Sequence, residues 1–350
     1  MQLPVVWSDD CLRHDPDGEV FVGVHTPAVE VAARVERIRE ALEAAGARVV
    51  PAERHGDEAL LAVHDAALVE YLRDAWAEWE RSGLRDDPGQ NRVVPYNFSR
   101  RGSGPRREPV AIWARAGWYA YDTMTPIGPG TWEAARAAVD CALTAVDLVA
   151  AGEPAAYACV RPPGHHAGRD SFGGACYLNN TAVAAEALRA RLGGPVAVVD
   201  IDAHHANGTQ ELFYDRADVV VASVHVDPGA GWFPHVLGFA DETGSGAGLG
   251  ANLNLPLAPG TGDDEWLAAV AEAADRAGGA RGLVVSLGVD AAAGDPESPL
   301  RVSDAGYREA GRILGALRLP TVVVQEGGYD LATIGPLVRE TLDGFGDGYG

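Results

Sequence analysis

Residues 200 to 209, DIDAHHANGT, follow directly on the apolar run Pro195 to Val199. A short apolar run that ends in acids and histidines is typical of a buried strand in a parallel sheet, because ligands bind at the carboxyl ends of such strands. In an extended chain the side chains of residues i and i+2 share a face, so Asp202 and His204 are expected to point to the same side. The stretch therefore predicts a parallel α/β sheet with a functional edge.

Comparable apolar runs recur along the chain, and stretches with helical spacing separate them. The runs are Ala47 to Val50, Ala155 to Val160, Pro195 to Val199, Val219 to Val224, Gly282 to Leu287 and Thr321 to Val324. Apolar residues have helical spacing in Val31 to Leu42, Trp132 to Ala151, Asn180 to Leu192, Asp264 to Ala277 and Asp304 to Leu317. This alternation predicts an α/β fold with a central, mostly parallel sheet flanked by helices. No polar linker divides it, so a single domain over residues 1–350 is expected.

Residues 82–110 interrupt this alternation. They contain four Gly, four Pro and six Arg against three acids, and they show no sustained periodicity. A loop of this length in a compact domain is usually either functional or disordered. The stretch is therefore interpreted as a long insertion, and both surface decoration and a role in an interface or in shaping the substrate site remain open.

Composition narrows the function classes. The formal net charge of -22 argues against DNA or RNA as a partner, because nucleic-acid binding needs a basic surface, and it is compatible with a cationic substrate. The N-terminus does not resemble a signal peptide, and no run of roughly 18 apolar residues occurs, so we expect a cytoplasmic protein without a membrane partner. The four cysteines, Cys11, Cys141, Cys159 and Cys176, are far apart and are expected to be reduced.

Polar clusters follow four of the apolar runs and should meet at one edge of the sheet. They are Arg161 to His166, Asp200 to Asn207, Asp290, and Glu326 to Tyr329. Asp202, His204 and Asp290 would supply two carboxylates and one imidazole, a donor set that suits a catalytic zinc site with one position left for water. A lone Asp or His at a strand end is more often a structural cap, but the combined pattern favours a metal site.

Two further groups have side chains suited to proton transfer and charge stabilisation. His165 and His166 follow Gly164, and imidazoles accept and donate protons near neutral pH. Tyr329 follows two glycines, and its phenol can donate a hydrogen bond to a developing oxyanion. The alternatives are a pair of hydrogen-bonded loop histidines and a structural tyrosine in a glycine-rich turn.

Taken together, these motifs closely resemble the histone deacetylase family over nearly the whole chain. The resemblance is carried by RPPGHHA (161–167), GACYLNN (174–180), DIDAHHANGT (200–209) and SLGVDAAAGDP (286–296). It implies one zinc-type ion per chain, bound by Asp202, His204 and Asp290. It also implies that His166 is the general base and that Tyr329 polarises the acetyl carbonyl.

The resemblance also assigns residues around the metal. His165 would be an electrostatic partner of His166, hydrogen-bonded to Asp200. A potassium ion would hold the metal-bearing loop from behind, through Asp200 and Ser223 and through the backbone carbonyls of Asp202, His204 and Val224.

Two positions depart from the family pattern. Asn207 stands where some members have Asp beside the second histidine, so His166 would have a neutral orienting partner and a lower pKa. Gly174 is expected to contact the substrate, and Ala175, which follows it, stands where many members have a Phe that walls the substrate channel. Trp232 or Phe233 would form the opposite wall, and the channel is expected to be wider or differently shaped.

Residues 117–132, preceded by the long insertion, are similar to the bacterial acetylpolyamine amidohydrolase branch. In that branch the insertion helps form a dimer and narrows the entrance to the active site, so a homodimer is expected. Glu297 stands seven residues after Asp290, where members selective for acetylpolyamines have Glu. A carboxylate there would meet the secondary ammonium of a polyamine, so an acetylated polyamine or similar small amine is the expected substrate.

Other functions remain open. An acetyl-lysine in a protein and an N-acetylated natural product are alternative substrates of the same chemistry. An arginase-like enzyme with two manganese ions would need an Asp two residues before Asp290, where Gly288 stands. A catalytically silent binding protein is disfavoured, because it would not need a complete set of metal ligands and proton-transfer groups.

Overall fold

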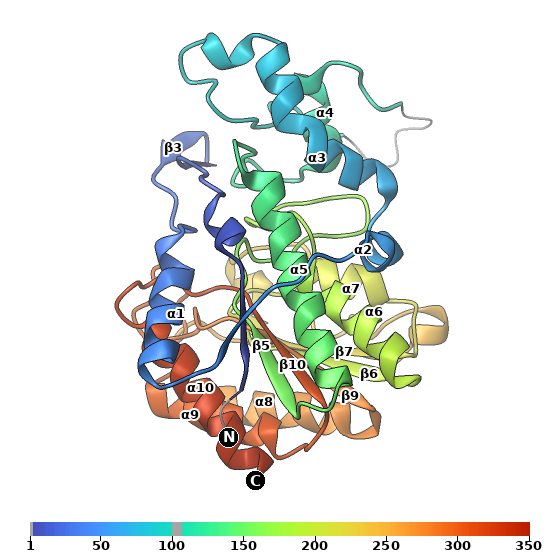
Figure 1. The fold of residues 1–350 in the computed structure, drawn as a ribbon, viewed down its shortest axis with the longest axis vertical. Coiled ribbons are helices and arrows are strands. Elements are labelled where there is room, and N and C mark those ends of the chain that lie inside the picture. Colours follow the sequence, from blue (N-terminus) through green and yellow to red (C-terminus); the bar gives the residue numbers. More distant parts are fainter. Residues whose placement is uncertain (1–2, 100–106) are drawn as a thin grey trace.

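The computed structural model describes residues 3–99 and 107–350. Its centre is an eight-stranded sheet in which every neighbouring pair of strands is parallel (Figure 1). In spatial order the strands are β4 (Val49–Pro51), β1 (Val5–Trp7), β5 (Ala155–Ala158), β10 (Thr321–Gln325), β9 (Gly282–Leu287), β6 (Val196–Asp200), β7 (Val219–Val226) and β8 (Asn252–Leu257). The predicted α/β class is confirmed.

Helices cover both faces of the sheet (Figure 1). The helices α1 (Ala33–Ala44), α8 (Asp263–Arg276), α9 (Asp304–Gly315) and α10 (Ile334–Tyr349) share one hydrophobic core with the sheet. The other core contains α3 (Ala66–Arg81), α5 (Thr131–Ala150) and α6 (Asn180–Leu192). Neighbouring residues of a strand belong to different cores: Val198 packs in one and Val199 in the other. The continuous apolar runs of the sequence follow from this burial on both faces.

Smaller elements complete the described chain. They are the helices α2 (Glu58–Val63), α4 (Ile112–Tyr119) and α7 (Asn207–Phe213), the antiparallel hairpin of β2 (Glu19–Phe21) and β3 (Val24–Thr26), and the 3-10 helices η1 (Asp9–Leu12), η2 (Leu84–Asp86), η3 (Pro228–Ala230), η4 (Gly246–Gly248) and η5 (Ala277–Gly279). The hairpin, α3 and α4 lie at one end of the molecule, at the top of Figure 1. None of the helices in the described ranges is long and apolar enough to cross a membrane.

All five predicted helices are present, but the sequence analysis missed β1, β8, the hairpin and the helices α2, α3, α4, α7 and α10. Helix α10 shows the physical reason. It contains four glycines between Gly335 and Gly348, and glycine is unfavourable inside a helix. In the structure an added Cβ at Gly344 would lie 1.9 Å from the carbonyl oxygen of Arg308, and one at Gly311 would lie 2.0 Å from that of Thr341. The glycines allow α9 and α10 to pack backbone against backbone, and this packing outweighs the helix propensity.

The insertion predicted at residues 82–110 is mostly irregular where the structure describes it. It contains η2 (Leu84–Asp86), and its residues 100–106 lie outside the described residues. The backbone groups of Val93 pair with those of Ile127 at 2.8 and 3.1 Å, and the indole N–H of Trp79 donates to the carbonyl oxygen of Gln90 at 2.8 Å. These bonds tie the first part of the insertion to the body of the domain.

The strand order brings the four polar clusters together. The clusters follow β5, β6, β9 and β10, and these strands are contiguous in the order β5-β10-β9-β6. Because all four are parallel, their carboxyl ends lie at one edge of the sheet. The predicted meeting of the four clusters is therefore confirmed.

Candidate active site

Asp202, His204 and Asp290 converge at the carboxyl ends of β6 and β9. One possible ligand atom from each lies within 4.8 Å of the others. His204 Nδ1 is 3.3 Å from Asp202 Oδ1 and 3.0 Å from Asp290 Oδ2. Both aspartates are buried, with at most 1 % of their surface exposed. Two carboxylates and one imidazole in this arrangement match the donor set of a catalytic zinc-type site.

The local backbone differs from the extended conformation that we expected. Strand β6 ends at Asp200, and residues 202–204 form a bend. The N–H of Asp202 donates to Asp200 Oδ1 at 3.0 Å, and that of His204 donates to Asp202 Oδ1 at 2.9 Å. Asp side chains favour such turns by accepting hydrogen bonds from nearby backbone N–H groups. Asp202 and His204 do lie together as expected, but the extended backbone assumed for them was wrong, because these turns, and not strand periodicity, bring them together.

The electrostatics of this group fit a bound cation. Burial, and next the charge of Asp202, raise the pKa of Asp290 to about 7. Burial lowers the pKa of His204, but its hydrogen bonds to Asp202 and Asp290 outweigh burial and raise the pKa well above the ordinary value. Two buried carboxylates side by side are unfavourable without positive charge between them. A proton on His204 partly supplies that charge, and a divalent cation would supply it fully.

A second group of possible ligands, His165, Cys176 and Glu326, lies nearby and is better explained as structural. Glu326 Oε2 accepts from the N–H groups of Gly164 and His165 at 2.7 and 3.1 Å. Its Oε1 accepts from the hydroxyls of Thr181 and Ser286 at 2.8 and 3.2 Å. With both oxygens occupied, Glu326 anchors the histidine loop to β10.

The two neighbouring histidines differ in charge. Their ring centroids are 4.0 Å apart, and His165 Nδ1 lies 3.0 Å from Asp200 Oδ2. Burial lowers the pKa of His165, but Asp202 and then Asp200 outweigh it and raise the pKa to about 10. Burial, and next the charges of His165 and His204, hold the pKa of His166 well below its ordinary value. These opposite shifts favour the imidazolium form of His165 and the neutral form of His166.

The predicted contact of His166 with Asn207 is present. His166 Nδ1 lies 2.6 Å from Asn207 Oδ1. An amide oxygen only accepts hydrogen bonds, so Nδ1 carries the hydrogen and Nε2 is the basic nitrogen. Asn207 thus fixes the tautomer without adding a negative charge.

Asp295 and Arg34 hold Tyr329 in place. Its N–H donates to Asp295 Oδ2 at 2.7 Å, and the guanidinium of Arg34 lies 4.7 Å from the centroid of its ring. Arg34 also donates to the carbonyl oxygens of Gly328 and Glu326, both at 2.6 Å. Burial raises the pKa of Tyr329 well above the ordinary value, so its phenol is neutral and available as a donor.

A buried Arg-Glu-Arg group supports this turn, and the sequence analysis missed it. Glu30 Oε1 accepts from Arg34 at 2.9 Å and from Arg161 at 2.8 Å. Arg161 also donates to the carbonyl oxygen of His14 at 2.7 Å. The group joins the segment before α1 to the histidine loop and to the Tyr329 turn. No local pattern in the sequence distinguishes these residues from surface ion pairs.

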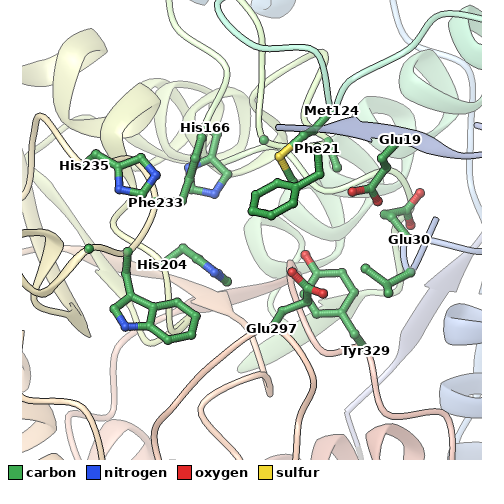
Figure 2. Close-up of a pocket in the computed structure, with 15 residues that line it drawn as sticks. Glu19, Phe21, Glu30, Met124, His166, His204, Phe233, His235, Glu297 and Tyr329 are labelled. Atoms are coloured by element: carbon green, nitrogen blue, oxygen red, sulfur yellow. The ribbon is translucent and has the colours of Figure 1, made fainter. Parts of the chain in front are cut away.

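A cavity of about 360 Å³ has His166, His204 and Tyr329 in its lining (Figure 2). Its lining comprises Glu19, Phe21, Val29, Glu30, Met124, His166, Gly174, Ala175, His204, Gly231, Trp232, Phe233, His235, Glu297 and Tyr329. All four residues expected near the substrate, Gly174, Trp232, Phe233 and Glu297, line it. The hairpin residues Glu19 and Phe21 were not expected, because only the tertiary structure brings β2 to this site.

The aromatic wall lies directly against the histidines. The ring of Phe233 is 4.8 Å from that of His166 and 6.3 Å from that of Tyr121. An added Cβ at Gly174 would lie 2.4 Å from His166 Cδ2, so a side chain there would displace the imidazole. Ala175 also lines the cavity, and Figure 2 shows Phe21 and Met124 in the lining as further apolar side chains.

Two carboxylates in the cavity have no ion-pair partner among residues 3–99 and 107–350: Glu19 and Glu297. Burial, and next the charge of Glu297, raise the pKa of Glu19 to about 7. Burial also raises the pKa of Glu297, although His204 opposes the shift. Figure 2 shows both carboxylates in the cavity, on the side away from His235. The cavity is therefore acidic and otherwise mostly apolar.

Two further expectations concern ions. Asp200 and Ser223, expected at a potassium site, are both buried and pair across β6 and β7, while Val224 follows in β7. At Gly288 an added Cβ would lie 2.1 Å from Asp202 Oδ2. No second carboxylate fits at Gly288, which argues against the two-metal, arginase-like alternative.

Comparisons with known proteins agree over the whole chain. The model of the histone deacetylase domain matches residues 28–345. An acetylpolyamine amidohydrolase of Mycoplana ramosa is 41% identical over 345 residues, which cover 98% of this chain and 99% of the relative. Acetylpolyamine amidohydrolase 1 of Pseudomonas aeruginosa is 40% identical over 346 residues, 97% of this chain and 98% of the relative. The crystal structure of an acetylpolyamine aminohydrolase from Burkholderia pseudomallei superposes with a TM-score of 0.93 at 38% identity and covers 99% of both chains.

Proposed function

Because the chain belongs to the histone deacetylase family, we propose that it is a metal-dependent deacetylase that hydrolyses an acetylated polyamine to the free amine and acetate. One observation carries the choice of substrate. Glu19 and Glu297, without an ion-pair partner among the described residues, line the same cavity as His166, His204 and Tyr329. A substrate with a second, positively charged amine would offset these half-buried carboxylates, whereas a neutral acetylated chain would cover them and leave them unpaired.

The arrangement of side chains suits amide hydrolysis. A zinc-type ion held by Asp202, His204 and Asp290 would act as a Lewis acid toward the acetyl carbonyl and toward water. Nε2 of the neutral His166 accepts the proton of the attacking water. The phenol of Tyr329 donates a hydrogen bond to the carbonyl oxygen as negative charge develops on it. The carbon-nitrogen bond then breaks, a protonated histidine gives its proton to the amine nitrogen, and acetate leaves.

His165 has a separate task in this proposal. Asp200, 3.0 Å from His165 Nδ1, favours a positive charge on His165, whose ring centroid lies 4.0 Å from that of His166. That charge disfavours protonation of His166 in the resting site and so keeps the base neutral. Asp200 and Asn207 orient the two histidines through the Nδ1 contacts given above.

A comparison of substrates tests the proposal directly. We expect the purified protein to hydrolyse acetylputrescine and acetylspermidine with a higher kcat/KM than an acetyl-lysine peptide. A preference for the peptide, or for an N-acetylated natural product, would contradict the polyamine assignment and leave the deacetylase chemistry standing. Absence of turnover with every acetylated amine would contradict the enzyme assignment itself.

The charge of Glu297 should matter for polyamines alone. We expect Glu297→Leu to lower kcat/KM for acetylated polyamines by at least about tenfold, since a partly desolvated ammonium-carboxylate pair contributes roughly 1.4 kcal/mol or more. Activity on a neutral acetyl-lysine peptide should hold or rise. Glu272→Leu removes the same charge from the exposed side of α8 and should change neither rate. Equal losses on both substrates would show that Glu297 supports its loop and does not select charge.

Asn207 offers a test of the general base. Asn207→Asp places a carboxylate on His166 Nδ1, which favours the imidazolium and raises the pKa of His166 by roughly one unit or more. A base must be neutral, so activity is lost as the pH falls through its pKa. The acidic limb of the pH profile of kcat/KM should therefore move to higher pH. An unmoved limb, at unchanged metal content, would exclude His166 as the base.

Further parts of the proposal concern assembly and ions. We propose that the chain forms a homodimer through the insertion at residues 82–110. Tyr96 and Phe98 in the insertion and Trp113 in the neighbouring helix α4 are exposed aromatic residues, which are common in protein interfaces. Light scattering after size-exclusion chromatography measures the mass. We also propose one zinc-type ion and one potassium ion per chain, which elemental analysis tests, and a cytoplasmic location.

A further inference from the structure

The aromatic wall of the cavity belongs to an irregular connection between two strands. β7 ends at Val226 and β8 begins at Asn252. Within this connection, residues 231–238, here called the wall segment, contribute Gly231, Trp232, Phe233 and His235 to the cavity. An irregular segment lacks the ladder of hydrogen bonds that fixes a strand, so other contacts must set its position.

Gly238 is held at both of its backbone groups. Its N–H donates to Glu242 Oε2 at 2.9 Å, and its carbonyl oxygen accepts from His225 Nε2 at 2.9 Å. The residue has a φ of +108°, and an added Cβ would lie 2.8 Å from His205 Cγ and 2.9 Å from His225 Nε2. Only glycine fits this position without displacing one of the imidazoles.

Glu242 connects Gly238 to a network of amide side chains. Besides Gly238, its Oε2 accepts from Gln210 Nε2 at 2.7 Å and from Asn254 Nδ2 at 3.2 Å. Gln210 Oε1 in turn accepts from Asn252 and Asn254 at 2.8 and 2.9 Å. Gln210, Asn252 and Asn254 are all at least 96 % buried, so water does not replace these bonds easily.

The network reaches the metal-binding group through His205. This residue follows His204 in the chain, is fully buried, and contacts Gln210 Oε1 through its Nε2 at 3.1 Å. Because amide and carbonyl oxygens only accept hydrogen bonds, His205 donates through Nε2 to Gln210 Oε1, and His225 donates through Nε2 to the carbonyl oxygen of Gly238. The bonds run without a gap from His205 through Gln210 and Glu242 to Gly238.

We propose that Glu242 is a positioning residue that fixes the wall segment relative to the metal-binding loop and so sets the affinity for the substrate. The inference rests on the proposed function, because it assigns the wall to the substrate. Glu242 touches no cavity residue of the reaction itself. Its loss removes one of the two hydrogen bonds that hold Gly238 and so loosens the wall segment, whereas the parallel pairing of β7 with β8 still holds both ends of the connection.

The expected signature is a change in KM rather than in kcat. Glu242→Leu removes the acceptor of three hydrogen bonds. The loss of one hydrogen bond to a charged group is enough to weaken substrate binding by about tenfold. We expect KM for the best acetylated amine to rise about tenfold or more. We expect kcat to stay within about threefold, because Asp202, His204, Asp290, His166 and Tyr329 are untouched. Metal content should remain that of the unmodified protein.

Two variants serve as matched controls. Glu242→Gln retains an oxygen that accepts from Gly238 and should restore most of the KM. Asp241→Leu removes the neighbouring charge, which makes no hydrogen bond or ion pair among the described residues, and should leave KM unchanged. An unchanged KM in Glu242→Leu, or an equal rise in Asp241→Leu, would overturn the proposal. A joint loss of kcat and metal would also overturn it, because the network would then support the whole fold.

Gly238→Ala disturbs the contact between Gly238 and Glu242 while Glu242 itself is intact. This variant tests the role of the contact if Glu242→Leu does not fold. The added Cβ meets His205 and His225, so the variant should reproduce the rise in KM; an unchanged KM would contradict the proposal.

Binding of inhibitors separates this inference from the substrate assignment. An aryl hydroxamate spans the metal and the wall, whereas acetohydroxamate reaches the metal alone, so calorimetry should show a loss of affinity for the aryl compound only. This binding measurement does not depend on whether an acetylated polyamine is the substrate. Equal losses of affinity for both hydroxamates would contradict the proposed role of the wall segment.

Discussion

Replacing Asp290 with alanine is expected to remove both the bound metal and the activity. Asp290 would supply one of three protein ligands, and its Oδ2 lies 3.0 Å from His204 Nδ1 in the same group. Lewis acid catalysis contributes several kcal/mol, and each 1.4 kcal/mol is about tenfold in rate, so activity should fall by at least about 10³-fold. Elemental analysis and turnover of acetylspermidine measure the two losses.

The controls for this variant separate ligation from loop support. Asp290 Oδ1 also accepts from the N–H of Ala203 at 2.8 Å, and Asp290→Asn retains an oxygen for that bond while losing the charge. If ligation is the role, both variants should lose the thermal stabilisation that zinc gives to the unmodified protein. Full metal content in Asp290→Ala would refute the assignment of the ligand.

The second large effect is expected from Tyr329→Phe. The substitution removes one hydroxyl and keeps the ring that lies against Arg34. Loss of one oxyanion donor usually costs about 10²- to 10³-fold in kcat, and we expect a loss of that size with KM and metal content nearly unchanged. Steady-state kinetics at saturating substrate measure it.

Tyr71→Phe is the matched control for Tyr329→Phe. Tyr71 is fully buried in the core beside α4, and its hydroxyl has no hydrogen-bond partner in the described structure. Its removal should leave turnover unchanged. Near-native turnover in Tyr329→Phe would mean that the phenol does not contact the reacting carbonyl.

The sequence by itself determined the fold class, the family and the residues that meet at the sheet edge. Apolar runs that are buried on both faces have a simple local signature, and the polar clusters after β5, β6, β9 and β10 stand out against them. The family match confirms the resemblance that these motifs indicated. Such features are predictable because each depends on a few residues that are close in the sequence, and because parallel strands bring their carboxyl ends to one edge.

Only the tertiary structure decided which distant residues complete the site. Glu19 reaches the cavity from a hairpin far from Glu297 in the chain, and Arg34 lies under the ring of Tyr329 across almost 300 residues of sequence. Glu242 likewise looks like any surface acid until Gly238 and Gln210 are seen to donate to it. A local sequence pattern shows helix and strand periodicity, but it does not identify the distant residue that pairs with a buried charge. That partner is set by how separate elements pack, and the cost of leaving a charge or a polar group unpaired makes the packed arrangement specific.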